Sequence, residues 1–450
     1  MKTDVLIIGG GPAGIVTALS AENTYKGLKI TVVRREKQVL VPCGIPYIFG
    51  TLPSPESDLI PDKVLTSKGI EIIVDEVADV DTSSKRVTLK SEEAIEYDKL
   101  VFATGSLPKV PPFAREKFEN LFSIRKNIDY LTRLKKEIEN SEEIVIIGGG
   151  FIGVEMSDEI AKRGKKVTIV EAMDHLLLQA FDDEFCVMAE DELRKRGVTI
   201  RTSATVKGFL GSNKRIEYVE LTSGEKLRAD LVIVCVGSYP NVELAKKAGL
   251  VIGYSGGIWV DEYLRTSVPD IFAVGDCAEK KDFFTREVTP VMLASIATCE
   301  ARIAGANLYR LKAVRETKGT LGVFSTAVGD LVLGVAGLTE ARARKEGFDV
   351  VVGESKTVDR HPGAIPDAHE VRAKLIFSKY SGVIMGAQLA GGKGVGEMIN
   401  IAGVAIQKGM TAVEMDTLQI GTHPLVTPPP TAYPLITAAA NAILKIFKEE

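Results

Sequence analysis

The first part of the chain alternates between short apolar runs and a segment with helical spacing. Residues 3–8 form an apolar run, glycines follow at once, and residues 13–22 place apolar side chains at helical spacing. Residues 29–33 then return to a short apolar run. A strand, a helix and a second strand in this order predict a βαβ unit, from which parallel sheets are built.

The same order returns in the middle of the chain. Residues 144–147 are apolar, glycines follow, residues 152–163 have helical spacing, and residues 166–170 are apolar again. Two more apolar runs, at residues 99–103 and 231–236, occupy matching places after the two units. The pattern therefore predicts an α/β fold with two similar parallel-sheet units.

Alternating polar and apolar residues mark the other predicted strands. Residues 71–80 and 86–89 alternate between the two units. Beyond about residue 320, alternation dominates at residues 331–335, 350–352 and 373–377, and two alanine-rich helical stretches follow. Half-buried strands accompanied by helices predict a separate C-terminal α+β domain.

Composition narrows the range of partners. The chain has 450 residues, 45% of them hydrophobic, and its net charge of −4 is spread over mixed charges. It has room for about three domains, and it lacks a basic tract for nucleic acid or an anionic membrane. No stretch approaches the roughly 18 uninterrupted apolar residues of a membrane span, and no leader precedes the first strand, so we expect a cytoplasmic protein. Five widely spaced cysteines form neither a C-x-x-C pair nor a metal-ligand cluster, so we expect reduced thiols and no metal.

The glycines of both units match a dinucleotide fingerprint. In a G-x-G-x-x-G turn the first glycine permits a tight turn, the second lets the backbone approach a pyrophosphate, and the third lets the helix pack on the strand. The helix N-terminus then meets the phosphate charge. Because each copy lies between a predicted strand and helix, we expect two nucleotide cofactors. The copies are Gly9-Gly10-Gly11-Pro12-Ala13-Gly14 and Gly148-Gly149-Gly150-Phe151-Ile152-Gly153.

The end of the second strand in each unit bears on nucleotide choice. In the second unit it carries Glu171, whose carboxylate can accept hydrogen bonds from an adenosine ribose and repel a 2′-phosphate. That favours NADH over NADPH. In the first unit the matching residue is Arg34, with Glu36 close behind. Either Glu36 reaches the ribose or Arg34 stacks on the adenine, and the sequence leaves both open.

Cys43 is the candidate redox residue. It lies in Val41-Pro42-Cys43-Gly44-Ile45-Pro46-Tyr47, where a loop enters a short predicted helix, so backbone N–H groups there would favour a thiolate. Thiolate is the species that attacks a disulfide. Three other cysteines lie in apolar or helical segments and are expected in the core: Cys186, Cys235 and Cys299.

With these residues the chain resembles the flavoprotein disulfide reductases that have two dinucleotide-binding domains. Within them it resembles the single-cysteine branch of NADH oxidases, coenzyme A disulfide reductases and NADH-dependent persulfide reductases. The resemblance covers almost the whole chain. It rests on both fingerprints and on Cys43-Gly44-Ile45-Pro46-Tyr47, Ala103-Thr104-Gly105, Val236-Gly237 and Ile271-Phe272-Ala273-Val274-Gly275-Asp276.

The resemblance implies a place for each cofactor. FAD would take the first fingerprint, with Asp276 on its ribityl chain, and NADH would take the second. The residues implied at FAD are Gly9, Gly11, Pro12, Ala13, Gly14, Arg34, Glu36, Pro42, Cys43, Ala103, Thr104, Gly105, Gly275 and Asp276. Those implied at NADH are Gly148, Gly150, Phe151, Ile152, Gly153, Glu171 and Gly237.

The resemblance also implies three domains and a homodimer or higher homo-oligomer. The expected fold class is α/β, with two Rossmann-like nucleotide-binding domains and a C-terminal α+β dimerisation domain. The FAD-binding domain would comprise residues 1–112 and 245–319, the NAD(P)H-binding domain residues 113–244, and the dimerisation domain residues 320–450.

The same resemblance bears on the catalytic residues. The dithiol branch carries a second cysteine five residues after the first, where this chain has Ile48, so Cys43 would cycle as a mixed disulfide, a persulfide or a sulfenic acid. His423 resembles a His-Pro histidine that acts as acid/base from the partner subunit, but Pro428 replaces its usual orienting Glu. A turn role and a catalytic role for His423 both stay open, with Tyr433 as a competing donor.

The sequence thus predicts electron transfer from NADH through FAD to a sulfur bonded to Cys43. The substrate would be a small disulfide, coenzyme A disulfide, a persulfide or a polysulfide. One alternative is an NADH oxidase that reduces oxygen with Cys43 as a sulfenate. Another, from a different class, is an NADH-sensing flavoprotein or electron carrier. The sequence identifies neither the sulfur compound nor whether coenzyme A binds.

Overall fold

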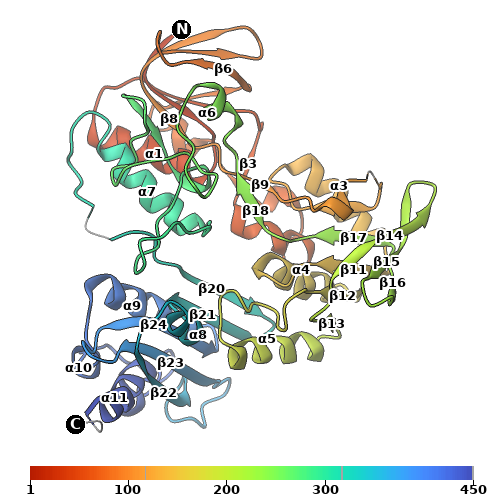
Figure 1. Cartoon of the computed structure of the whole chain (residues 1–450), viewed down its shortest axis with the longest axis vertical. Helices are drawn as coiled ribbons and strands as arrows, with labels where there is room; N and C mark the ends of the chain where they lie inside the picture. Colours follow the sequence, from red (N-terminus) through yellow and green to blue (C-terminus); the bar gives the residue numbers. More distant parts are fainter. Residues whose placement is uncertain (117, 316–317, 448–450) are drawn as a thin grey trace. The chain divides into compact units, whose positions relative to one another are not determined.

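The computed structural model describes residues 1–116, 118–315 and 318–447. In it the chain folds into two compact units (Figure 1). Each unit gathers segments that are distant in the sequence. Unit 1 combines Met1–Pro111, Phe122–Asn140 and Val236–Thr320, and unit 2 combines Pro112–Leu121, Ser141–Cys235 and Leu321–Glu450. The domain boundaries expected from the sequence stay a prediction.

Unit 1 is built on a seven-stranded sheet whose central strands are parallel. Its order is β5-β2-β1-β8-β7-β6, with β19 also paired to β8. Only the pairs β6–β7 and β7–β8 are antiparallel. The strands are β1 (Lys2–Ile8), β2 (Ile30–Arg34), β5 (Glu71–Val74), β6 (Val77–Asp81), β7 (Arg86–Leu89), β8 (Ala94–Phe102) and β19 (Ile271–Ala273).

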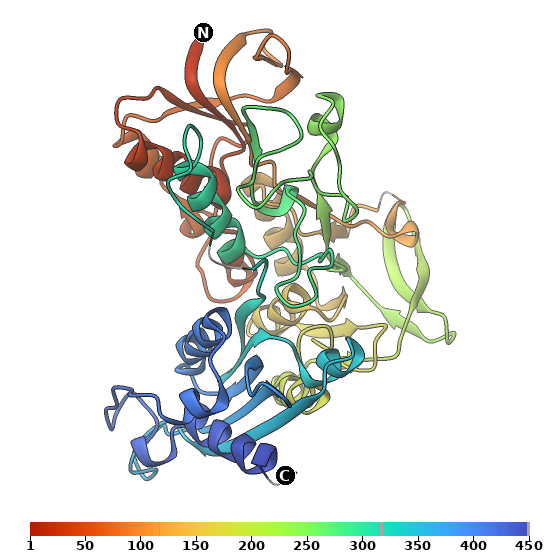
Figure 2. The same cartoon turned by 60° about the vertical axis from the view of Figure 1, so that its left-hand side comes forward.

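The central strands of this sheet are buried on both faces, which explains their unbroken apolar runs. Leu6, Ile7 and Val101 are all 0% exposed. One face is covered by α1 (Pro12–Thr24), beside which α7 (Ala294–Ala306) packs, as Figure 2 shows. The predicted first βαβ unit is therefore present.

Further elements of unit 1 lie in the segments that connect its strands. The segment after β2 contains two 3₁₀ helices, η1 and η2, and these carry the residues around Cys43. The connecting elements are β3 (Val39–Leu40), η1 (Pro42–Phe49), η2 (Pro55–Asp58), β4 (Leu59–Ile60), α2 (Lys63–Thr66), β9 (Ser106–Pro108), α3 (Ile128–Asn140), β18 (Ser238–Pro240), α6 (Glu243–Lys247) and η4 (Gly275–Cys277). The short strand β10 (Leu121–Ser123) precedes α3.

Unit 2 contains the second predicted βαβ unit. Four strands of its parallel sheet lie in the order β17-β11-β12-β13. They are β11 (Glu143–Ile147), β12 (Lys166–Val170), β13 (Thr199–Arg201) and β17 (Leu231–Val234), with α4 (Phe151–Ala161) and α5 (Asp183–Lys195) as helices. A small antiparallel sheet is formed by β14 (Val206–Ser212), β15 (Arg215–Leu221) and β16 (Lys226–Arg228), and η3 (Pro112–Ala114) packs against β14.

The C-terminal part of unit 2 is the predicted α+β layer. Its five-stranded antiparallel sheet has the order β20-β21-β24-β23-β22. The strands are β20 (Val323–Val328), β21 (Leu331–Gly337), β22 (Val350–Val358), β23 (Glu370–Ser378) and β24 (Ile384–Gly391). The helices are α8 (Glu340–Lys345), α9 (Val395–Lys408), α10 (Ala412–Asp416), η5 (Pro430–Ala432) and α11 (Pro434–Ile446), of which α9 packs on β21 and β24 and α11 on β22 and β23.

Two details of the fold differ from the sequence-based expectation. The alternating segment at 71–80 is two strands, interrupted at Asp75, whose carboxylate accepts the Glu76 N–H at 2.6 Å. Cys299, expected in the core, is exposed on α7, so that expectation was wrong. Within the described residues, no helix has both the length and the apolar character needed to cross a membrane.

Candidate functional site

The turn between β1 and α1 has the geometry expected of a turn that binds a pyrophosphate. Gly9 has a φ of +116°, and a Cβ on Gly14 would overlap the carbonyl oxygen of Gly9, so helix and strand meet closely. Gly11 is the N-cap of α1, Pro12 follows it, and no side chain caps the N–H groups of this first turn. No atom of a more distant residue lies within 4 Å of the Cβ position of Gly11. These residues fit a phosphate that the backbone approaches closely.

The second fingerprint repeats this geometry in unit 2. Gly148 has a φ of +111°, and a Cβ on Gly153 would overlap its carbonyl oxygen. The space in front of Gly150 is open in the same way as that in front of Gly11. Phe151, the first residue of α4, packs edge to face on Phe324 with ring centroids 4.7 Å apart, whereas Ile152 is 39% exposed. The second cradle therefore fits a pyrophosphate as well.

Glu171 lies directly after β12 and faces the second glycine turn. Its Oε2 accepts the N–H of Gly149 at 2.6 Å, and its Oε1 accepts the N–H of Met173 at 2.8 Å. These two bonds fix the carboxylate at the carboxyl end of β12, where an adenosine ribose is bound in this kind of fold. The placement agrees with the role predicted for Glu171, which stays a prediction.

In unit 1, Asp276 lies on η4, whose first residue, Gly275, packs close to Ala13 of the first fingerprint. Its carboxylate accepts a hydrogen bond from the Ser106 hydroxyl at 2.7 Å and pairs with Lys126 at 3.5 Å. The turn itself is anchored from beneath, because the Gly275 N–H donates to Glu300 at 2.9 Å. Glu300 in turn forms a buried ion pair with Lys280 at 2.9 Å.

The Ala103-Thr104-Gly105 segment lies next to the first glycine turn in unit 1. The carbonyl of Ala103 lies directly against Gly9, where any Cβ would overlap it. The Thr104 hydroxyl donates to the carbonyl oxygen of Asn241 at 2.6 Å, and the Asn241 N–H donates to the carbonyl of Gly105 at 2.9 Å. Gly237 also lies in unit 1, whereas the other residues predicted at NADH lie in unit 2.

Cys43 is the second residue of η1 and is exposed. Pro42 begins this helix, and the predicted short helix is thus present as a 3₁₀ helix. Ile48, which occupies the place of a second redox cysteine, is 0% exposed. Lys135 of α3 holds the far end of η1, because its ammonium donates to the carbonyls of Ile48 at 3.1 Å and Pro53 at 2.7 Å.

Asp58 is a buried carboxyl group packed against the Cys43 loop, and sequence reasoning missed it. The residue is 5% exposed, and a Cβ on Gly44 would overlap its Oδ1. Its carbonyl oxygen accepts the Val41 N–H at 2.8 Å. Its Oδ2 is buried without a hydrogen-bond partner in the described structure. Burial raises the pKa of this carboxyl to about 6.

This raised pKa predicts an unusual dependence of stability on pH. Between the unfolded pKa of 3.8 and the folded pKa of about 6, the folded protein holds a proton that the unfolded chain releases, so stability falls as the pH rises through this window. Asp58→Asn should remove that loss and raise the stability above pH 6 by about 1–3 kcal/mol. Urea unfolding of both proteins at pH 4 and pH 7.5 measures it.

Glu56→Gln serves as the control on the same 3₁₀ helix. A hydrogen bond from the Ser54 side chain lowers the pKa of Glu56. Removing the Glu56 carboxylate should therefore leave the protein slightly less stable at neutral pH, whereas Asp58→Asn should make it more stable. A slope with pH that survives in Asp58→Asn would assign the effect to another group.

Arg34 and Glu36, both implied at the adenosine of FAD, are engaged with protein groups. Arg34 is 4% exposed, and its guanidinium binds the Asp62 carboxylate through Nη1 and Nη2 at 2.6 Å each. Glu36 accepts the Nε–H of Arg35 at 2.7 Å. Sequence reasoning missed Asp62, which looks like an ordinary acid before a short helix and gives no signal by itself.

His423 and Tyr433 lie in unit 2, whereas Cys43 lies in unit 1. His423 is exposed, and its Nδ1 accepts the N–H of Leu425 at 3.2 Å, which leaves the proton of a neutral ring on Nε2. Tyr433 is 7% exposed before α11, and burial raises the pKa of its phenol. Their catalytic role across subunits stays a prediction.

A second missed carboxyl group lies in the first turns of α4. Glu155 accepts a hydrogen bond from the Thr326 hydroxyl of β20 at 2.8 Å. Burial raises its pKa to about 7, the Thr326 bond opposes this shift, and the neighbouring Glu159 adds to it. Glu155 comes two residues after the last glycine of the second fingerprint. This position, beside the apolar face of a helix, was the only hint of its role in the sequence.

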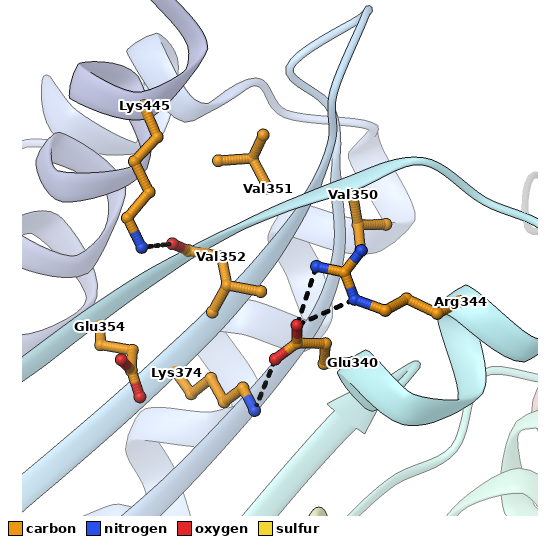
Figure 3. A pocket seen from close by; sticks show the side chains of 8 residues that line it. All are labelled: Glu340, Arg344, Val350, Val351, Val352, Glu354, Lys374 and Lys445. Carbon is orange, nitrogen blue, oxygen red and sulfur yellow. Dashed lines mark hydrogen bonds and ion pairs between the residues drawn. The ribbon is translucent and has the colours of Figure 1, made fainter. Parts of the chain in front are cut away.

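The structure also has a cavity of about 430 Å³ in the C-terminal part of unit 2, drawn in Figure 3. All of its charged side chains already have partners. Glu340 pairs with Lys374 and Arg344 at 2.9 Å each, Lys445 donates to the carbonyl of Val352 at 2.7 Å, and Glu354 pairs with Arg372 at 3.2 Å. Since each of these side chains already has a hydrogen-bond or ion-pair partner within the protein, the cavity is a poor candidate for the chemistry.

Together, two phosphate cradles and an exposed thiol on the unit that carries the first cradle define an oxidoreductase that uses two nucleotide cofactors. Among the described residues, no group of His, Cys, Asp and Glu could hold a metal. The redox chemistry of this class is that of FAD and NAD(P)H.

The chain belongs to the pyridine nucleotide-disulphide oxidoreductase family, whose model matches residues 3–301. The dimerisation domain of the same family matches residues 323–432, which agrees with the homo-oligomer expected from the sequence. It is therefore a flavoprotein that uses FAD and NAD(P)H, and its branch is the one with NADH oxidases and coenzyme A persulfide reductases.

Three comparisons locate the chain within the family. It is 32% identical over 451 residues to an NADH oxidase of Methanocaldococcus jannaschii, covering 98% of this chain and 99% of the relative. It is 34% identical over 397 residues to an NAD(P)H coenzyme A polysulfide/persulfide reductase of Pyrococcus horikoshii, covering 87% and 88%. The solved structure of a NAD-dependent persulfide reductase from A. fulgidus superposes with a TM-score of 0.91 at 31% identity, covering 100% of this chain and 84% of that one.

Proposed function

We propose that this flavoprotein reduces sulfur–sulfur bonds formed with Cys43, using electrons from NADH. The acceptors would be coenzyme A disulfide, another small disulfide, or a persulfide or polysulfide. The observation that carries the proposal is the exposed position of Cys43 on η1, with the buried Ile48 in place of a second thiol. A lone accessible thiolate must take its sulfur partner from the substrate.

The proposed cycle balances with two electrons. The Cys43 thiolate attacks the disulfide RSSR, a Cys43–SR mixed disulfide forms, and one RS⁻ leaves. Bound FAD supplies the conversion of a nicotinamide hydride into the two electrons that break the new S–S bond. The overall reaction is NADH + H⁺ + RSSR → NAD⁺ + 2 RSH. Cys43 offers its sulfur to the substrate from an exposed position on η1, and Asp58 beside Gly44 holds a proton near this loop below about pH 6.

Glu171 supports NADH as the preferred donor. Its carboxylate is fixed by the N–H groups of Gly149 and Met173, at 2.6 and 2.8 Å. A fixed negative charge accepts hydrogen bonds from a ribose diol and repels a 2′-phosphate. We infer a preference for NADH over NADPH.

Oxygen is the second candidate acceptor. The M. jannaschii relative, which covers 98% of this chain, is an NADH oxidase. In this case oxygen would be the oxidant, and Cys43 would cycle between thiolate and sulfenate.

Anaerobic titration with NADH followed by acceptors distinguishes the two functions. We expect two thiols per NADH from coenzyme A disulfide, and a long-wavelength thiolate–flavin absorption band in the reduced enzyme. Oxygen consumption by the same preparation without a sulfur acceptor should be much slower. Fast oxygen consumption without anaerobic thiol release would support the oxidase instead. Negligible turnover with either acceptor, together with an NADH-dependent change of assembly, would overturn both in favour of a sensor.

A further inference from the structure

The two glycine turns of this chain differ at one position that contacts the bound nucleotide in this fold. In unit 2 the strand next to the turn ends in Glu171, whose carboxylate accepts the Gly149 N–H at 2.6 Å. In unit 1 the matching residue is Arg34, a donor that cannot accept the N–H of Gly10. The site for the adenosine of FAD therefore lacks the carboxylate that the second site has at this position.

The stem of Arg34 fills the space of that missing carboxylate. A Cβ on Gly10 would lie 2.7 Å from Arg34 Cδ and 3.0 Å from its Cβ. In unit 2 a Cβ on Gly149 would lie 3.0 Å from both Cβ and Cγ of Glu171. The two side chains thus leave their strands in the same direction across their glycine turns, but Arg34 carries its charged group further out.

The guanidinium of Arg34 binds the carboxylate of a second residue, Asp62. Nη1 and Nη2 each donate to one oxygen of Asp62 at 2.6 Å, and Nη2 also donates to the Lys37 carbonyl at 2.8 Å. The Arg34 side chain is 3% exposed, whereas that of Asp62 is 47% exposed. A fork of this kind fixes both groups in one geometry. The half-exposed Asp62 carboxylate is thereby held at the surface, next to the arginine that packs on the first glycine turn.

One donor in this cluster is left without a partner. Arg34 Nε is buried and has no hydrogen-bond acceptor in the described structure. A buried N–H without an acceptor is unfavourable, so it points to a group that binds there. A ribose hydroxyl can accept from such a donor and donate to a carboxylate at the same time.

We propose that Asp62, positioned by Arg34, holds the adenosine ribose of FAD in place of the carboxylate that the second strand lacks. Asp62 accepts from the ribose hydroxyls, and Arg34 Nε donates to one of their oxygens. Asp62 also neutralises Arg34, so the pair favours a neutral ribose over a 2′-phosphate, which a lone arginine would attract. Glu36, paired with Arg35 at 2.7 Å, is not needed for this contact.

The proposal rests on FAD as the cofactor but not on the sulfur substrate, so its test uses binding alone. Apo-protein is titrated with FAD and with FAD analogues whose adenosine lacks the 2′- or the 3′-hydroxyl, and flavin fluorescence reports binding. We expect at least one analogue to bind the natural protein about 10-fold more weakly than FAD, the loss of one hydrogen bond to a charged group. Asp62→Asn should weaken FAD binding about 10-fold and bind FAD and the analogues alike.

Three results separate the proposal from its rivals. Glu36→Gln should keep both the affinity and the discrimination, and a loss of discrimination in this variant would move the ribose contact to Glu36. Full discrimination in Asp62→Asn would overturn the proposal. Should that variant fail to fold, equal binding of FAD and both deoxy analogues by the natural protein would also overturn it. Glu171→Gln, in the second site, should leave FAD affinity unchanged.

Discussion

Cys43→Ser should lower the anaerobic reduction of coenzyme A disulfide by about 10³-fold or more, because a serine hydroxyl cannot exchange with a disulfide. Binding of FAD and NADH should persist, since the substitution exchanges one sulfur for oxygen on η1 and leaves both glycine turns unchanged. Electron transfer from NADH to an artificial acceptor that takes electrons directly from the flavin should stay within about 3-fold. Stopped-flow kinetics under anaerobic conditions measures both rates.

Cys299→Ser is the matched control for this experiment. Cys299 is the other exposed cysteine, and it lies on α7. Its replacement should change neither rate. If Cys43→Ser reduced the sulfur substrate at the natural rate, sulfur would not pass through this residue. Equal losses with the sulfur substrate and the artificial acceptor would indicate damage to the flavin site instead.

The parts of the fold that could be predicted were those with strong local signals. The apolar runs at residues 3–8 and 144–147 became β1 (Lys2–Ile8) and β11 (Glu143–Ile147), because strands buried on both faces need unbroken apolar sequence. The glycine turns added a second local signal, since only glycine tolerates the close approach to the preceding backbone.

Strand order could not be predicted from these signals. The single alternating segment at 71–80 became β5, which pairs with β2, and β6, which pairs with β7 at the other edge of the sheet. Strand β24 was missed, because all eight of its residues are buried and give no alternation. Pairing partners are set by long-range packing, which one strand's pattern does not encode.

The candidate site divides in the same way. Cys43 and the two glycine turns were visible because their chemistry depends on neighbours in the sequence. Asp62 acquires its place only through Arg34, which is 28 residues away, and Asp58 through the close approach of Gly44. An acidic residue on its own is usually a solvated side chain, so no sequence pattern singles out these two.

Lys374→Met should destabilise unit 2 by about 3–5 kcal/mol, because it leaves the buried carboxylate of Asp182 without its cation. Lys374 is 7% exposed on β23, and its ammonium lies 2.9 Å from Asp182, 2.8 Å from Glu184 and 2.9 Å from Glu340. Burial opposes its charge, but these carboxylates outweigh the burial and raise the pKa of Lys374. The ion pairs join the start of α5 to α8 and to β23. The midpoint of thermal unfolding at pH 8 measures the loss.

The electrostatic origin of this loss can be separated from simple repacking. Lys356→Met on the neighbouring strand β22 removes an ion pair with Glu370 at 2.8 Å, but that lysine side chain is 68% exposed. Its loss should change stability by less than about 1 kcal/mol. Lowering the pH to 5 should reduce the difference between Lys374→Met and the natural protein, since the repelling carboxylates can then take up protons. An equal difference at pH 5 and pH 8 would instead assign the loss to the cavity left by the shorter side chain, because a packing defect does not depend on protonation.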